Sequence, residues 1–198
     1  MIGAEPVESA RYAPGTCTVV DPMLAGRVAR ADATLRRATA FLSGDRPPSC
    51  RSDASDAPPR VLGNALRELD RFLHILIDEV ACAHGLPPRT EQRNTANKLE
   101  PLSHALPGSG RRLRALGRSR ACLFYTGGVV RRADVPGGAW MTAGWPLAGE
   151  LRRFALGQQL SPSAADLADV CRFYDRLGAE LVRGLYESAR PERLRFED

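Results

Sequence analysis

The sequence contains almost no lysine, few aromatic residues and no long apolar run. Of its 28 basic residues only Lys98 is a lysine, so arginine carries nearly all of the formal net charge of +5. A guanidinium group suits phosphate better than an ammonium group does, because its planar fork of donors can bind two oxygens at once. A GC-rich genome would produce the same excess of arginine, and we take that as the explanation for the chain as a whole.

Other absences narrow the class of protein. The five cysteines are widely spaced without a C-x-x-C pair, which suggests neither a disulfide framework nor a zinc site, so we expect a reducing, cytoplasmic location. Residues 1–10 lack the basic and apolar regions of a signal peptide. The most apolar stretch, residues 72–77, is too short to span a membrane. No phosphate-binding loop, dinucleotide glycine fingerprint or zinc-protease motif occurs, so we expect no metal and no cofactor.

Apolar residues recur at helical spacing over most of the chain, and 198 residues suffice for one domain with its own core. Each amphipathic helix has one apolar face, which only packing against another helix can cover. The sequence therefore predicts an all-α fold, a bundle of four to five helices with a small β-hairpin appendage. The predicted helices cover about 21–43, 61–84, 90–106 (kinked at Pro101), 110–125 and 161–190.

The remaining segments have other compositions. We expect an irregular lead-in over residues 1–20, a single domain over 21–190, a mobile loop rich in proline at 44–60, and a tail at 191–198.

Short β-rich pieces on both sides of a P-G-G turn at 136–138 predict a β-hairpin near 129–145, and residues 151–156 either add a strand or remain irregular. Trp140 and Trp145 fall in this region and could stack on bases. Tryptophan in a hairpin that packs on helices is more often part of the core, so we expect a core position for both.

One segment departs from the overall composition. Residues 111–132 contain seven arginines and no aspartate or glutamate. Genome composition raises arginine everywhere, but it does not remove every acid from one window. This segment is therefore a better candidate for anion binding than the overall charge. Its arginines are Arg111, Arg112, Arg114, Arg118, Arg120, Arg131 and Arg132.

A helical wheel separates Arg120 from its neighbours. Arg120 projects to the apolar side of the helix, whereas Arg111, Arg114 and Arg118 project to the polar side. A buried guanidinium group without a partner would cost several kcal/mol, so Arg120 requires either an acidic partner or a wet cleft. The candidate partners, on the helix at 61–84, are Glu68, Asp70 and Glu79. The two alternatives are an internal ion pair and a functional cleft.

Two histidines, His74 and His84, lie on or beside the apolar stripe of the helix at 61–84. We expect both to bond a neighbour or a helix end rather than to act in a site.

The run LRALGRSRACLFYTGGVVRRAD at 113–134, which follows two long predicted helices and precedes another, resembles the signature region of the HEPN superfamily of helical nucleotide-binding domains. The family pattern has an Arg, often followed by Asn, then a small or apolar run, a His and a glycine-containing turn. Arg120 matches the family Arg, and Gly127 and Gly128 match the turn. Tyr125 stands in the place of the His, and Ala121 stands where Asn is common.

This resemblance implies a metal-independent ribonuclease site made of the Arg and the His at the cleft of a homodimer. The change at Tyr125 bears on that chemistry, because a phenol with an ordinary pKa of about 10 is a poor general base near neutrality. His104, on another predicted helix, is the remaining imidazole that could replace it. We therefore expect a HEPN-like scaffold whose cleft holds RNA or a nucleotide without efficient ribonuclease activity.

Three hypotheses follow from the sequence. In the first, the chain is a binding module with Arg120 and Tyr125 in its cleft and Arg118, Arg131 and Arg132 as phosphate contacts. In the second, it is an enzyme, a ribonuclease with an altered site that uses Arg120 with Tyr125 or His104. In the third, it is a structural or regulatory interaction protein in which Arg120 forms only an internal ion pair.

Overall fold

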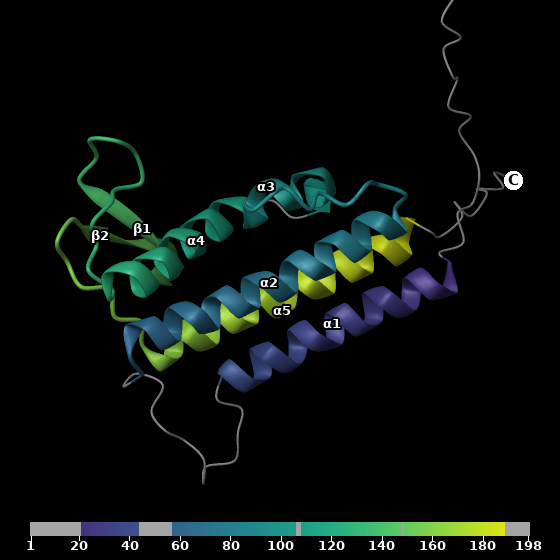
Figure 1. Cartoon of the computed structure of the whole chain (residues 1–198), viewed down its shortest axis with the longest axis horizontal. Coiled ribbons are helices and arrows are strands. Elements are labelled where there is room, and N and C mark those ends of the chain that lie inside the picture. Colours follow the sequence, from purple (N-terminus) through teal and green to yellow (C-terminus); the bar gives the residue numbers. More distant parts are fainter. Residues whose placement is uncertain (1–20, 44–56, 106–107, 148, 189–198) are drawn as a thin grey trace, which may run out of the picture.

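Four long helices lie side by side, and a short β-hairpin covers one end of them (Figure 1). The structure is a computed structural model that describes residues 21–43, 57–105, 108–147 and 149–188. It confirms the predicted helical bundle with a small hairpin. The predicted lead-in, most of the predicted loop at 44–60 and the predicted tail lie outside the described residues. The elements are α1 (Pro22–Leu42), α2 (Pro59–Ala83), α3 (Thr95–Leu99), the 3-10 helix η3 (Glu100–Ala105), α4 (Ser109–Thr126), β1 (Trp140–Leu147), β2 (Glu150–Ala155) and α5 (Ala164–Ser188).

The helices α2 and α5 form the middle of the bundle, with α1 on one side and α4 on the other (Figure 1). The core is made mainly of leucines from these helices, which are fully buried at Leu35, Leu69, Leu73, Leu123 and Leu177. Burying each such side chain contributes about 1.5–3 kcal/mol to folding. None of the described helices has both the length and the apolar character needed to cross a membrane.

The start of α1 agrees with the predicted range, whereas the starts of α2 and α5 differ from it by two or three residues. The Asp21 side chain accepts a hydrogen bond from the Met23 N–H and caps α1, at the predicted start of this helix. The helix α2 begins at Pro59, so residues 59 and 60 are not part of the predicted loop. The predicted start of α5 at Ser161 is wrong, because Ser163 and Asp166 cap the helix reciprocally through their side chains and backbone N–H groups.

The predicted hairpin at 129–145 is wrong in its pairing. The strands β1 and β2 pair with each other, with Trp140 opposite Ala155, and their connection includes Gly149 rather than the P-G-G turn. Val130 is buried where it exchanges backbone hydrogen bonds with residues 157 and 158. Val129 and Val130 therefore pair with the chain after β2, and residues 131–139 form a loop. Of the two alternatives for residues 151–156, the strand is confirmed.

The hairpin is fixed to α4 by a close approach of two backbones. Gly144 lies against Leu116, and its N–H donates to the buried Ser119 hydroxyl at 3.1 Å. Arg112 donates to the Gly144 carbonyl at 2.9 Å and pairs with Asp169 of α5. Arg112 therefore joins α4, β1 and α5, and it has a structural role.

We predict that Gly144→Ala lowers the free energy of unfolding by about 3 kcal/mol. A Cβ at residue 144 would overlap the Leu116 side chain and lie 2.8 Å from the Leu116 Cα, so the two backbones would have to separate. Urea unfolding followed by circular dichroism measures the change.

Gly117→Ala on α4 is the matched control, because nothing lies within 4 Å of the added Cβ. Alanine is the better helix former, so this variant should be more stable than the wild type by about 0.5–1 kcal/mol. Equal stability of the two alanine variants would contradict the proposed packing.

Candidate functional site

A groove of about 800 Å³ runs along α4. The segments at 93–95 and 131–133 border it, and Asp70 reaches it from α2. Its charged lining consists of six arginines and one aspartate, namely Arg93, Arg114, Arg118, Arg120, Arg131, Arg132 and Asp70. The groove is therefore strongly positive.

Small residues on α4 make the groove hollow. Gly117 has no side chain, and the position of its missing Cβ faces open space. Ala121, one helical turn further on, also lines the groove. The long side chains of Arg118 and Arg120, between these two small residues in the sequence, also line the groove. The short run G-R-S-R-A at 117–121 therefore supplies both its floor and part of its walls.

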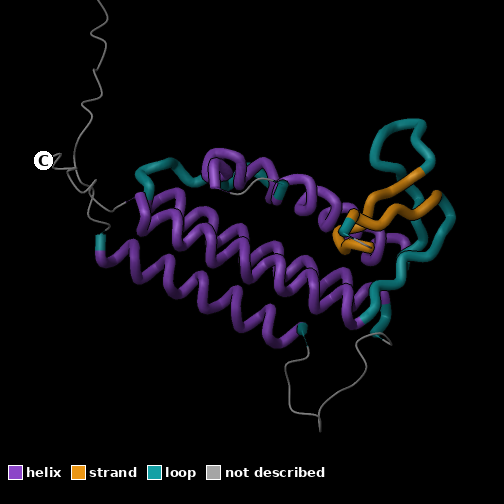
Figure 2. The backbone as a smooth tube through the Cα atoms, turned by 180° about the vertical axis from the view of Figure 1, so that it is seen from behind, coloured by secondary structure: helices purple, strands orange, loops and turns teal. Residues whose placement is uncertain are grey.

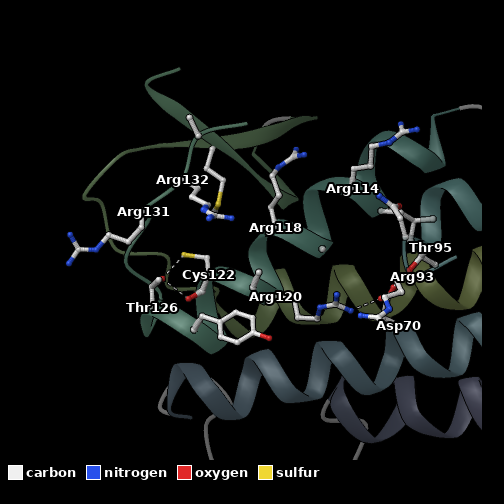
Figure 3. Close-up of a pocket in the computed structure, with 17 residues that line it drawn as sticks. Asp70, Arg93, Thr95, Arg114, Arg118, Arg120, Cys122, Thr126, Arg131 and Arg132 are labelled. Carbon is white, nitrogen blue, oxygen red and sulfur yellow. Dashed lines mark hydrogen bonds and ion pairs between the residues drawn. The ribbon is translucent and has the colours of Figure 1, made fainter. Parts of the chain in front are cut away.

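The groove has two chemically distinct ends (Figure 3). At one end, Arg93 and Thr95 lie beside Asp70, and Arg114 extends away from it. At the other end, Arg131 and Arg132 lie near Thr126 and Cys122, on the segment that follows α4. Arg118 and Arg120 lie between the two ends.

Arg120 forms an internal ion pair and also lies in a cleft, the two alternatives that the sequence left open. Its Nη1 donates to the Asp70 Oδ2 at 2.5 Å, so it forms an ion pair within the chain with one of its three predicted partners. The same side chain lines the groove and is 31% exposed, whereas the Asp70 side chain is 14% exposed. The ion pair is therefore part of the groove wall.

Two linked hydrogen bonds, through Thr95 and His74, hold the Asp70 carboxylate in place. The Thr95 hydroxyl donates to the Asp70 Oδ1 at 2.5 Å, and the His74 Nε2 lies 2.8 Å from the same hydroxyl. Because the single hydroxyl proton of Thr95 points to Asp70, His74 must donate through Nε2–H. Burial lowers the pKa of His74 below its ordinary value, which favours the neutral ring. His74 thus bonds a neighbour as predicted, and His84 ends α2.

The arginines of the acid-free segment obtain carboxylates from other parts of the chain. Arg118 pairs with Asp134 at 2.7 Å, and Asp134 also holds Thr142 of β1 through the backbone N–H and the hydroxyl. The exposed Arg111 lies 4.0 Å from Glu150, a distance at which the attraction is weak.

Three guanidinium groups of the groove have no hydrogen bond or ion pair with any described residue, those of Arg93, Arg131 and Arg132. All three residues are exposed. Their donors remain available to a ligand.

Tyr125 lines the same groove and is 77% exposed, the most exposed of the large apolar or aromatic side chains among the described residues. Its ring meets Phe124 edge to face, with 4.9 Å between the ring centroids. Because most of Tyr125 is exposed, its ring is accessible to a flat ligand.

The structure brings together all five residues that the sequence singled out, since Arg118, Arg120, Tyr125, Arg131 and Arg132 line one groove. It does not place the His104 side chain, which lies outside the described part of the chain. Sequence reasoning missed Arg93 and Thr95. Only tertiary packing brings the start of α3 over α4, and no local signal in the sequence marks that contact.

No protein-family model, curated protein or solved structure matches this chain. The resemblance to the HEPN superfamily therefore stays a prediction from the sequence. Within the described ranges, no group of three histidine, cysteine or acidic side chains is arranged to hold a metal ion.

We predict that Asp70→Ala lowers the free energy of unfolding by about 2 kcal/mol, because it leaves the Arg120 guanidinium half-buried without its partner. Glu68→Ala on the same helix is the control. Glu68 pairs with Arg71 at 2.8 Å, but both side chains are about half exposed, so its loss should cost less than about 1 kcal/mol. Equal losses in chemical denaturation would show that the Asp70 pair is no stronger than a surface pair.

The depressed pKa of His74 predicts a dependence of stability on pH. The unfolded chain takes up a proton near the ordinary value of 6.5, and the folded chain does so only at lower pH. Neutral His74 therefore makes its full contribution to the free energy of unfolding above about pH 6.5. This contribution is lost as the pH falls through the folded pKa.

His74→Gln should make the loss of stability between about pH 7 and pH 5 shallower than in the wild type. The glutamine amide keeps a donor for Thr95 but does not titrate in this range. Unfolding free energies measured across this range would contradict the assignment if both proteins gave the same slope.

Proposed function

We propose that this chain binds a nucleotide or nucleic acid through its phosphates, in the groove on α4, without efficient ribonuclease activity. The observation that carries the proposal is the set of unpaired arginines Arg93, Arg131 and Arg132, which line one groove together with the exposed ring of Tyr125.

The chemistry of the lining favours a phosphate ester over other anions. Guanidinium groups bind phosphate oxygens in pairs, and these charge-assisted bonds are among the strongest hydrogen bonds in proteins. The ring of Tyr125 offers a stacking surface for a base, which a simple inorganic anion or an acidic peptide would not use. A groove of about 800 Å³ is within the size range of sites that hold small organic ligands.

The same lining supports binding more than cleavage. Among the described residues of the groove there is no histidine, and Arg120 already forms an ion pair with Asp70. A general base for the attacking hydroxyl is therefore not evident in the groove. The resemblance to the HEPN superfamily would add that two copies of the chain pair around this groove, and the homodimer belongs to the proposal on that basis.

Replacing both Arg131 and Arg132 by alanine should weaken the binding of a short oligouridylate. The slope of log affinity against log salt should fall by about one for each phosphate that is no longer neutralised. Neither side chain has a partner among the described residues, so the fold should keep its stability. Fluorescence anisotropy with a labelled oligonucleotide at several salt concentrations measures both the affinity and the slope.

The control is the double variant Arg30→Ala and Arg37→Ala. It removes the same charge from α1, which lies on the side of the bundle away from α4 (Figure 1). It should keep the salt slope of the wild type. Undetectable binding by the wild type at low salt would overturn the proposal and favour the structural or regulatory hypothesis.

The same mixtures separate binding from cleavage. Gel analysis should recover the RNA intact, with the wild type and Arg120→Ala at the same background rate. Metal-independent cleavage that Arg120→Ala abolishes would instead establish the ribonuclease hypothesis.

A further inference from the structure

The two tryptophans, both expected in the core, have different environments. Trp145 is fully buried, whereas the Trp140 side chain is 53% exposed at the start of β1. Tryptophan has a large apolar surface, and its exposure often marks a binding surface. The expectation of a core position is confirmed for Trp145 and wrong for Trp140.

Trp140 lies one residue from the wall of the groove. The next residue, Met141, is buried and lines the groove. Because successive side chains of a strand point to opposite faces, Trp140 belongs to the outer face of the hairpin. The rim between this face and the groove is the loop that carries Arg131 and Arg132, which is fixed to β1 by the hydrogen bond from the Asp134 N–H to the Trp140 carbonyl at 2.9 Å.

The outer face of the hairpin carries positive charge as well. Trp140 pairs with Ala155, so Arg153, two residues before Ala155 on β2, shares the face of Trp140. Arg153 is exposed and has no hydrogen bond or ion pair with any described residue. A path from the groove over the rim therefore meets Arg131, Arg132, Trp140 and Arg153, three guanidinium groups and one aromatic ring.

We propose that the ligand is a single-stranded nucleic acid that leaves the groove over Arg131 and Arg132 and stacks a base on Trp140, with Arg153 at a phosphate. This inference rests on the proposed function and extends it from a nucleotide to a strand. Unpaired bases are required because a duplex hides the base faces that an aromatic side chain stacks on. An apolar protein partner fits less well, since it would have to cover three unpaired guanidinium groups.

The test compares uridine monophosphate with an oligouridylate of about six nucleotides, bound to the wild type and to Trp140→Ala. The inference requires that only the oligonucleotide extends from the groove to Trp140. The variant should bind the oligonucleotide about tenfold more weakly, the loss expected for one stacked base, and bind the mononucleotide as the wild type does. Tyr186→Ala is the matched control, because Tyr186 is also about half exposed but lies near the end of α5, away from the hairpin.

The fluorescence of Trp140 gives a second readout. Trp145 is buried, so a soluble quencher such as acrylamide acts mainly on Trp140. The oligonucleotide should protect this fluorescence from acrylamide, and the mononucleotide should not.

The outcomes separate this inference from the proposed function. If Trp140→Ala binds the oligonucleotide as tightly as the wild type, the inference falls while the proposed function stands. If the wild type binds neither ligand, both fall. If protection of Trp140 rises with protein concentration in the absence of nucleic acid, this face joins two copies of the chain and the inference is overturned.

Discussion

The positive charge along α4 has to be neutralised by carboxylates from the rest of the structure. The segment that contains this helix has arginines but no acids of its own, so every carboxylate that neutralises it must come from another element. Arg112 finds Asp169 on α5, Arg118 finds Asp134 on the loop before β1, and Arg120 finds Asp70 on α2. Each ion pair thereby joins α4 to a different part of the fold.

The candidate site also contains arginines that have no carboxylate partner. Arg131 and Arg132 follow the end of α4, Arg93 precedes α3, and Arg114, Arg118 and Arg120 lie on α4, so the groove collects arginines from three separate stretches of the chain (Figure 3). The view from behind the bundle shows that the hairpin and its loops gather at one end of the helices (Figure 2). This end therefore combines a rigid helical support with exposed loops, which is a common arrangement for binding sites. The single lysine, Lys98, takes no part, because it is buried in an ion pair with Asp78 at 2.7 Å.

The helices could be predicted from the sequence because their apolar periodicity is local information. The helical wheel also turned Arg120 toward the apolar side of α4, and Asp70 was named among three candidate partners, which the Arg120–Asp70 ion pair confirms. The wheel separated Arg114 and Arg118 from Arg120, but all three side chains line the groove. The hairpin could not be predicted in the same way. Its pairing depends on whether Val130 pairs with β1 or with the chain after β2. Tertiary packing decides between the two, and Val130 pairs with the chain after β2. Arg93 and the exposure of Trp140 were missed for the same reason.

The most direct test of the central claim, that the unpaired guanidinium groups of this groove hold the ligand, is an NMR titration of the arginine Nε–Hε signals with an oligonucleotide. Arg131, Arg132 and Arg93 should shift strongly as ligand is added. Arg27 and Arg36 on α1, which are paired with Glu79 and Asp32, should stay unchanged. Shifts of equal size over all arginines, or none in the groove, would contradict the account.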